Sequence, residues 1–259
     1  MNGRVELSHY DPNIQEKVHR AIELLSVRLR VRGGLVPEEQ SSLIAEDLGI
    51  DPDQVLQILL HTQAHAYPEV PEVLRKILSG GLPIFWTNGE IHRGVEGAPF
   101  GYAGFQPFKL FNLDINHILP EIYARAVQSG LEMIHGGFDK FAESVLDPIM
   151  RAVSSGTGLN HVIVADDNWD NLRRIADIFS CNGLSPALYH VDRAGVMDKR
   201  DSTLPIISIS DLGYIPIQPA LYMLDVDRTV VDTIRLKLDW AHKFADCIGV
   251  NAMTNRINS

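Results

Sequence analysis

LYMLDVDRT, residues 221–229, is the stretch of this 259-residue chain that decides its expected fold. Its first four residues are apolar and typical of a short buried strand, and Asp225 and Asp227 follow where that strand ends. Charged groups at the end of a buried strand are costly unless a metal ion or a substrate compensates them. The two carboxylates, separated by a single residue, therefore indicate a site for Mg²⁺ and phosphate.

Short apolar runs alternate with amphipathic segments from residue 70 onward. Strands are expected near residues 82–87, 161–165, 186–191, 205–209 and 221–225, and helices near 71–79, 118–129, 139–153 and 169–180. This alternation is typical of an α/β protein with a Rossmann-like parallel sheet that carries helices on both faces. Ligands bind at the carboxyl ends of the strands in such sheets, which is where Thr87, Asp166 and Asp225 are expected.

The N-terminal part is expected to be entirely helical. Helices are predicted over residues 12–31, 37–48 and 52–65, and the last two begin with a proline in the first turn. The segment 233–249 is predicted to be one further helix. We therefore expect an α/β core at residues 67–231 and a small all-helical domain that is divided between residues 1–66 and 232–259.

The stretch that ends in Asp225, Asp227 and Thr229 resembles the first motif of the haloacid dehalogenase-like (HAD) phosphohydrolases, an apolar strand followed by Asp-x-Asp-x-Thr. Three further segments resemble the other motifs of that family. The second motif corresponds to the strand that ends in Thr87, Asn88 and Gly89. The third corresponds to Lys140, expected at the start of the helix 139–153, with Lys109 as the alternative lysine.

The fourth motif corresponds to an apolar strand that ends in Ala165, Asp166 and Asp167, with Ala165 in place of the usual glycine. Asp166 is the expected ligand there. Either Asp167 or Asp170 could serve as a further metal ligand of this motif. Asp170 is alternatively the cap of the helix that follows. Along the chain the motifs come in the order second, third, fourth, first, which is a rotation of the family's usual order. The resemblance thus implies a circularly permuted chain. It also implies that the divided helical domain is a cap, to which both ends of the sequence belong.

The resemblance implies a Mg²⁺-dependent phosphatase that acts on a small organic phosphate ester through an aspartyl-phosphate. Asp225 would be the nucleophile and Asp227 the general acid and base, while Thr87 and Lys140 stabilise the phosphoryl charge. The remaining implied roles form two sets. The substrate-binding residues would be Thr87, Asn88, Gly89 and Lys140, and the Mg²⁺ ligands would come from Asp225, the Asp227 carbonyl, Asp166, Asp167 and Asp170. A phosphotransferase or phosphomutase using the same site, and a non-catalytic binding protein of this fold, are the alternatives.

The composition favours a small molecule as the partner. A net charge of −10 and a pI near 5.4 argue against nucleic acid. Two cysteines are too few for a disulfide framework, and no apolar run has the length of a membrane span, so we expect no membrane partner and a cytoplasmic location. A small phosphorylated metabolite is the expected ligand. The sequence also allows a homodimer, including one in which the strand near Asp225 completes the sheet of a second copy.

Three other features of the sequence bear on the surroundings of the site. The segment 100–111 carries five aromatic residues and is expected to pack over the core, with a substrate wall or a partner surface as the alternatives. The connection between Thr87 and Lys140 is longer than the resemblance requires, which indicates an inserted segment near the site. Arg228 stands where the family often has glycine and is expected to narrow the access to Asp225.

Overall fold

The apolar runs of the sequence form the strands of one parallel sheet. The computed structural model describes residues 7–32, 37–89, 91–155, 159, 161–193 and 203–257. Six strands pair side by side in parallel. They are β1 (Leu82–Asn88), β4 (Ile134–Gly137), β5 (Val162–Asp166), β6 (Ala187–Val191), β7 (Ile206–Ile209) and β8 (Leu221–Leu224). The predicted α/β class and the five predicted strands are confirmed.

The strand order places the last strand of the sequence inside the sheet. The order is β4-β1-β8-β5-β6-β7, so β8 lies between β1 and β5 of its own chain. All four of its residues are buried, as their apolar side chains require. The chain leaves β1 toward one edge of the sheet and leaves β5 toward the other. Because crossovers between parallel strands are right-handed, these two connections cover opposite faces of the sheet.

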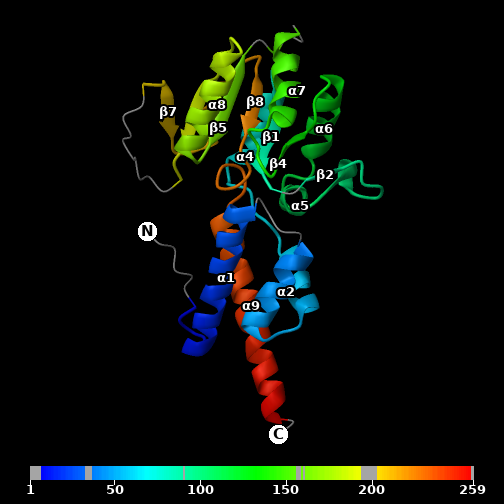
Figure 1. Cartoon of the computed structure of the whole chain (residues 1–259), viewed down its shortest axis with the longest axis vertical. Helices are drawn as coiled ribbons and strands as arrows, with labels where there is room; N and C mark the ends of the chain where they lie inside the picture. Colours follow the sequence, from blue (N-terminus) through cyan, green and yellow to red (C-terminus); the bar gives the residue numbers. More distant parts are fainter. Residues whose placement is uncertain are drawn as a thin grey trace.

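Helices surround this sheet and also form a separate group (Figure 1). Those around the sheet are α4 (Val70–Leu78), α5 (Phe105–Phe111), α6 (Leu119–Gln128), α7 (Glu143–Ser154) and α8 (Trp169–Cys181), with 3-10 turns η1 (Pro99–Gly101) and η2 (Leu212–Tyr214). The separate group consists of α1 (Pro12–Arg32), α2 (Pro37–Leu48), α3 (Pro52–His61) and α9 (Thr233–Ile257). A short hairpin of β2 (His92–Arg93) and β3 (Tyr102–Ala103) projects beside α5 and α6 (Figure 1).

The four helices of the separate group come from both ends of the sequence and pack on one another. α1 contacts α2 and α9, and α3 contacts α2 and α9. Their facing side chains, including Val18, Leu59 and Phe244, are fully buried, which is what stabilises the group. Two neighbouring segments join this group to the sheet. They are hydrogen-bonded to each other, since Asp232 N–H donates to His65 O at 2.8 Å and Tyr67 N–H donates to Val230 O at 3.2 Å.

Three details of the sequence prediction are corrected. β4 was not predicted, because Gly136 and Gly137 lower the strand propensity of its sequence. α7 begins at Glu143, so Lys140 lies in the loop after β4 and not at the start of a helix. α3 ends at His61, four residues earlier than predicted. Only in α3 does a loop follow the apolar part of the segment sooner than its periodicity indicates.

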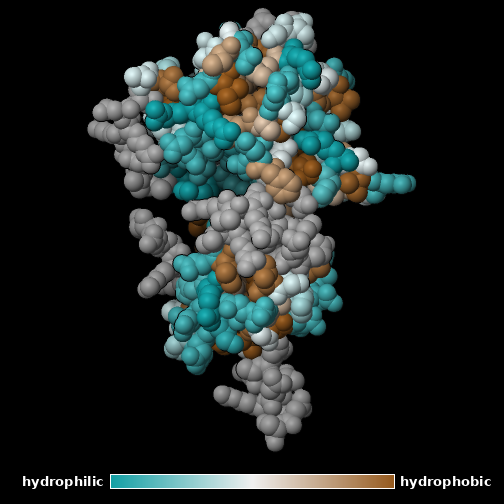
Figure 2. All heavy atoms as spheres, in the orientation of Figure 1, coloured by the Kyte–Doolittle hydropathy of each residue, from teal (hydrophilic) through white to brown (hydrophobic). Residues whose placement is uncertain are grey.

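The aromatic segment packs mainly within the molecule, as expected. Tyr102 and Phe105 are buried, and the ring of Phe100 lies 5.0 Å from that of Tyr123 on α6. Hydrophilic residues dominate the visible surface over the sheet, with apolar residues exposed in patches between them (Figure 2). Among the described residues, no helix has both the length and the apolar character that crossing a membrane requires.

Candidate functional site

Two neighbouring strands bring the predicted acidic residues together at their carboxyl ends. Asp166 is the last residue of β5, and Asp225 directly follows β8 and donates its N–H to Ala165 O at 2.9 Å. Asp167 comes next in the chain. One carboxylate oxygen from each of Asp166, Asp167 and Asp225 lies within 4.8 Å of the others. The parallel register of β5 and β8 is therefore what creates this cluster of three carboxylates.

Lys140 reaches the same place from the loop after β4. Its ammonium Nζ donates to Asp166 Oδ2 at 2.7 Å and to Asp225 Oδ1 at 2.5 Å, and it lies 3.9 Å from the centre of the Trp86 ring. The backbone of Lys140 is held as well. Its N–H donates to Asn88 Oδ1, and its carbonyl accepts from Trp86 Nε1, each at 2.9 Å. The lysine side chain is thus fixed between two carboxylates by the end of β1.

Burial and charge together set the protonation of this cluster. Burial raises the pKa of Asp225 well above its usual range, and the nearby charges of Asp166 and Asp167 add to that effect against the opposing charge of Lys140. Burial alone would lower the pKa of Lys140, but Asp166 and Asp225 outweigh it and the pKa is raised. Burial, with the charge of Asp166, raises the pKa of Asp167 to about 6. The ammonium is therefore held charged among acids that repel one another.

Asp166 is the most constrained acid of the cluster. Besides Lys140 it accepts from Asn168 N–H at 2.7 Å and from Asn171 Nδ2, which lies 3.1 Å from each carboxylate oxygen. Asn168 also caps α8, because its side chain accepts from the N–H groups of Asp170 and Asn171. Asp170 is exposed on the first turn of α8 and lies outside the cluster of three carboxylates. The helix cap is thus Asn168, and Asn171 is the neighbour that holds Asp166.

Asp227 lies in the turn that follows β8 and has different partners. Lys109 Nζ donates to its Oδ1, and Gln106 Nε2 donates to its Oδ2 at 3.0 Å. Burial opposes the ionisation of Asp227, but the charge of Lys109 and the hydrogen bonds from Lys109 and Gln106 outweigh burial and lower the pKa. Lys109, the alternative to Lys140 in the sequence, is therefore paired with the second acid of the motif, while Lys140 is paired with the first.

The end of β1, with Thr87 and Asn88, and the following Gly89 border the same region. Thr87 is 1 % exposed and its Oγ1 donates to Asn88 O at 3.2 Å. Asn88 binds Lys140 N–H through Oδ1, and its carbonyl accepts from Gln106 Nε2 at 2.9 Å. Gly89 donates its N–H to Gly137 O at 2.9 Å and has a positive φ of 139°. Its special role is steric, because a Cβ there would lie 2.6 Å from Gln106 Cγ.

The charges around the site nearly balance. Arg228, in the left-handed region with φ 61°, pairs with Asp167 at 3.1 Å. Within the described part of the chain, four site carboxylates (Asp166, Asp167, Asp225, Asp227) are contacted by three cations (Lys140, Lys109, Arg228). The formal sum is one negative charge. Oxygen ligands of this kind suit Mg²⁺, so the donor set fits the ion that the sequence implies, with Asp166, Asp167 and Asp225 as the side chains able to hold it.

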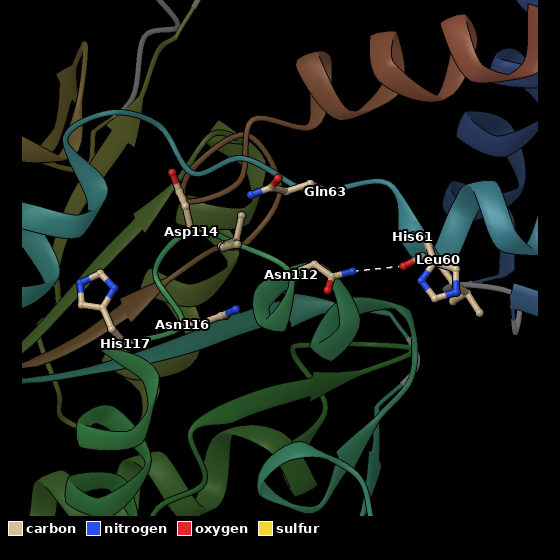
Figure 3. A pocket seen from close by; sticks show the side chains of 8 residues that line it. Leu60, His61, Gln63, Asn112, Asp114, Asn116 and His117 are labelled. Atoms are coloured by element: carbon tan, nitrogen blue, oxygen red, sulfur yellow. Dashed lines mark hydrogen bonds between the residues drawn. The ribbon is translucent and has the colours of Figure 1, made fainter. Parts of the chain in front are cut away.

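A separate open pocket of about 550 Å³ lies between the end of α3 and the segment after α5 (Figure 3). Most of its lining is polar: His61 and Gln63 come from the end of α3 and the residues after it, and Asn112, Asp114 and His117 come from the segment after α5. Asn112 Nδ2 donates to Leu60 O at 3.2 Å and so connects α5 to α3 across the pocket. None of the predicted site residues lines it.

Comparison of this chain with protein-family models, with curated proteins and with solved structures finds no match. The contacts and charges described above are therefore what any functional interpretation of the site depends on.

Three residues of the site were missed in the sequence. Trp86 places its ring against the Lys140 ammonium, Asn171 holds Asp166, and Gln106 joins Asn88 to Asp227. Trp86 and Asn171 are each adjacent to a motif residue or one turn beyond it, so their position along the chain was the available signal. Gln106 lies in the inserted segment, and no local pattern connects it with Asp227, which is 121 residues away.

Proposed function

We propose that this chain is a Mg²⁺-dependent phosphatase that hydrolyses a small organic phosphate ester through an aspartyl-phosphate on Asp225. The observation that carries the proposal is the buried Lys140 ammonium, which joins Asp225 to Asp166 beside Asp167 at the carboxyl ends of two adjacent strands. A cation buried between acids has little structural benefit, because replacing such groups by apolar ones is often neutral or stabilising. The arrangement is what phosphoryl transfer to a carboxylate requires.

The chemistry divides into two displacements at phosphorus. In the first, an oxygen of the ionised Asp225 carboxylate forms a bond to phosphorus, the bond to the ester oxygen breaks, and Asp227 gives a proton to that leaving oxygen. Asp227 would take up this proton beside the bound phosphate, whose negative charge opposes the effect of Lys109 on its pKa. In the second, water attacks phosphorus, the bond to Asp225 breaks, and Asp227 takes the proton from the water as inorganic phosphate leaves. Lys140 neutralises negative charge at Asp225 in both displacements. A bound Mg²⁺ would add charge neutralisation between the carboxylates and the phosphate.

In this proposal, the helices α1, α2, α3 and α9 form a cap over the site. Its two connections to the sheet run side by side, and one of them, the segment from Asp225 to Asp232, contains the acids of the first motif. A movement of the helices would therefore act directly on the site. As in the HAD phosphohydrolases that the sequence resembles, such a cap would exclude water and select the leaving group.

The test is phosphate release from a panel of small phosphate esters, with Mg²⁺ and with EDTA. We expect turnover by the wild-type chain in Mg²⁺, none in EDTA, and a loss of at least about a thousandfold in Asp225→Asn, because the nucleophile is removed. Asp177→Asn is the matched control, since Asp177 is an exposed acid on α8 that contacts none of the site residues named above. Turnover that survives in Asp225→Asn, or a folded wild-type chain that releases no phosphate from any ester, would refute the proposal.

A further inference from the structure

The helix α5 supplies both donors that hold Asp227. Lys109 donates to one carboxylate oxygen of Asp227 and Gln106 donates to the other. The two residues are three positions apart, so they lie on the same face of α5. Since each oxygen has its own donor, the plane of the carboxylate is fixed as well as its position. Asp227 itself follows β8, and the contact therefore joins two parts of the chain that only the tertiary fold brings together.

We propose that Lys109 and Gln106 are positioning residues that orient the Asp227 carboxylate toward the water that hydrolyses the aspartyl-phosphate. This inference depends on the proposed function, because it assigns a task within that reaction. The proton balance is simple: the attacking water loses one proton to Asp227, its oxygen bonds to phosphorus, and the Asp225 oxygen leaves. Lys109 and Gln106 both donate to Asp227, so in this proposal they act through it.

The burial of the two donors supports a role beyond packing. The side chain of Lys109 is 4 % exposed, whereas that of its partner Asp227 is 39 % exposed. A lysine that is removed from water in order to meet a partly exposed acid gives up hydration that a surface pair would keep. Gln106 Oε1 is buried and accepts no hydrogen bond within the described part of the chain. Its amide is thus oriented for Asn88 and Asp227 at the expense of its own acceptor.

The helix that carries these donors is itself held on three sides. Gly89 allows the close approach of Gln106 to the end of β1, because any Cβ at that position would clash with the Gln106 side chain. The Phe105 ring lies 5.9 Å from that of Trp240 on α9, and Asn112 at the end of α5 donates to Leu60 O on α3. Such a supported helix presents its donors with little freedom, which is what precise orientation of a reacting group needs.

The two half-reactions allow a direct test with p-nitrophenyl phosphate in Mg²⁺. Its phenolate leaves without needing a proton, so the first displacement is insensitive to the orientation of Asp227, whereas the second is not. In Gln106→Ala and in Lys109→Met we expect the steady-state rate to fall about tenfold to a hundredfold, while the single-turnover rate of phenolate release stays within about threefold of wild type. Phosphorylated protein then accumulates, and a burst of phenolate stoichiometric with the protein precedes the slow phase.

Leu110→Ala is the matched control, because Leu110 lies on the same helix and is fully buried but is not among the contacts to Asp227. It removes apolar packing from α5 but neither donor, so the steady-state rate is expected to fall less, relative to the single-turnover rate, than in Gln106→Ala and Lys109→Met. If both rates fall equally in Gln106→Ala and Lys109→Met, if neither falls, or if Leu110→Ala slows the second displacement as much as they do, the positioning role is refuted while the phosphatase stands. A wild-type chain without Mg²⁺-dependent turnover refutes the phosphatase, and the positioning role with it, before any variant is compared.

Discussion

Replacing Lys140 by methionine tests whether the buried ammonium holds the site together. The variant keeps a side chain of similar length next to the Trp86 ring but removes the charge that contacts Asp166 at 2.7 Å and Asp225 at 2.5 Å. Asp166 is fully buried and Asp225 is 6 % exposed, so neither carboxylate has water as a substitute partner. The substitution therefore leaves two buried acids without their shared cation.

The expected cost follows from these contacts. Removing one partner of a buried ion pair destabilises a protein by about 3–5 kcal/mol, because the remaining charge stays buried and uncompensated. For a chain of this size, 1 kcal/mol shifts the melting temperature by about 2–4 °C. We therefore expect Lys140→Met to lower the Tm by about 6–20 °C in a buffer with EDTA. Mg²⁺ should recover part of this loss, since a divalent cation compensates the same acids.

The assay is thermal unfolding followed by circular dichroism, with EDTA and with Mg²⁺, at neutral pH. Lys76→Met is the matched control, because Lys76 pairs with Glu72 on the surface of α4, where both side chains are more than half exposed. Surface pairs of this kind contribute little, and the control should unfold at the wild-type temperature. A Tm for Lys140→Met within about 3 °C of wild type would show that Asp166 and Asp225 do not depend on the ammonium, and the reasoning would be wrong.

Three further outcomes are expected. Burial and the charge of Arg93 lower the pKa of His135 from 6.5 to about 4, so between these pH values the unfolded chain binds a proton that the folded chain does not. Urea unfolding should therefore show that the free energy of unfolding falls by about 3 kcal/mol from pH 6.5 to pH 4, and that this fall is missing in His135→Gln. An equal fall in the wild type and the variant would contradict the prediction. Gly89→Ala should lower the free energy of unfolding by about 1–3 kcal/mol in the same assay. Gly80→Ala, whose added Cβ has no neighbour within 4 Å, should change it by less than about 0.5 kcal/mol, and similar values for both variants would contradict the steric role of Gly89. Mg²⁺ at a hundred times its Kd should add about 2.7 kcal/mol to stability, and less to that of Asp167→Asn; equal gains would place the ion elsewhere.

The sheet was largely predictable from the sequence because its inner strands are buried on both faces. Runs such as the one that contains Ile163 or Met223 are apolar throughout, and that signal needs no tertiary information. β4 escaped prediction for a tertiary reason. A Cβ on Gly136 would lie 2.1 Å from Thr87 O, so the strand approaches β1 more closely than any side chain allows. Gly136 therefore allows the close contact with β1, and the same glycine lowers the strand propensity by which β4 would have been predicted.

The site was predictable only in part. Asp166, Asp167 and Asp225 follow apolar strands, so the geometry of a parallel sheet brings them together. The partners of Lys140 and Lys109 were not predictable from local pattern, because each lysine lies in a loop or short helix far along the chain from the acid that it contacts. A sequence lists both lysines as candidates. The resemblance favoured Lys140 as the lysine beside Asp225, whereas only the folded chain assigns Lys109 to Asp227.

The central position of β8 has a consequence for the order of folding. β1 pairs with β4 on one side, and β5 pairs with β6 on the other, but these two halves of the sheet meet only through β8. During synthesis, both halves therefore exist with an unpaired inner edge until Leu224 has been added, long after their own strands are complete. Open edges of this kind readily pair with other chains, and contacts between distant segments form slowly. The strand that precedes the candidate nucleophile is thus also the last strand of the sheet to be synthesised. A chain truncated before β8 would expose two unpaired strand edges that are prone to aggregation.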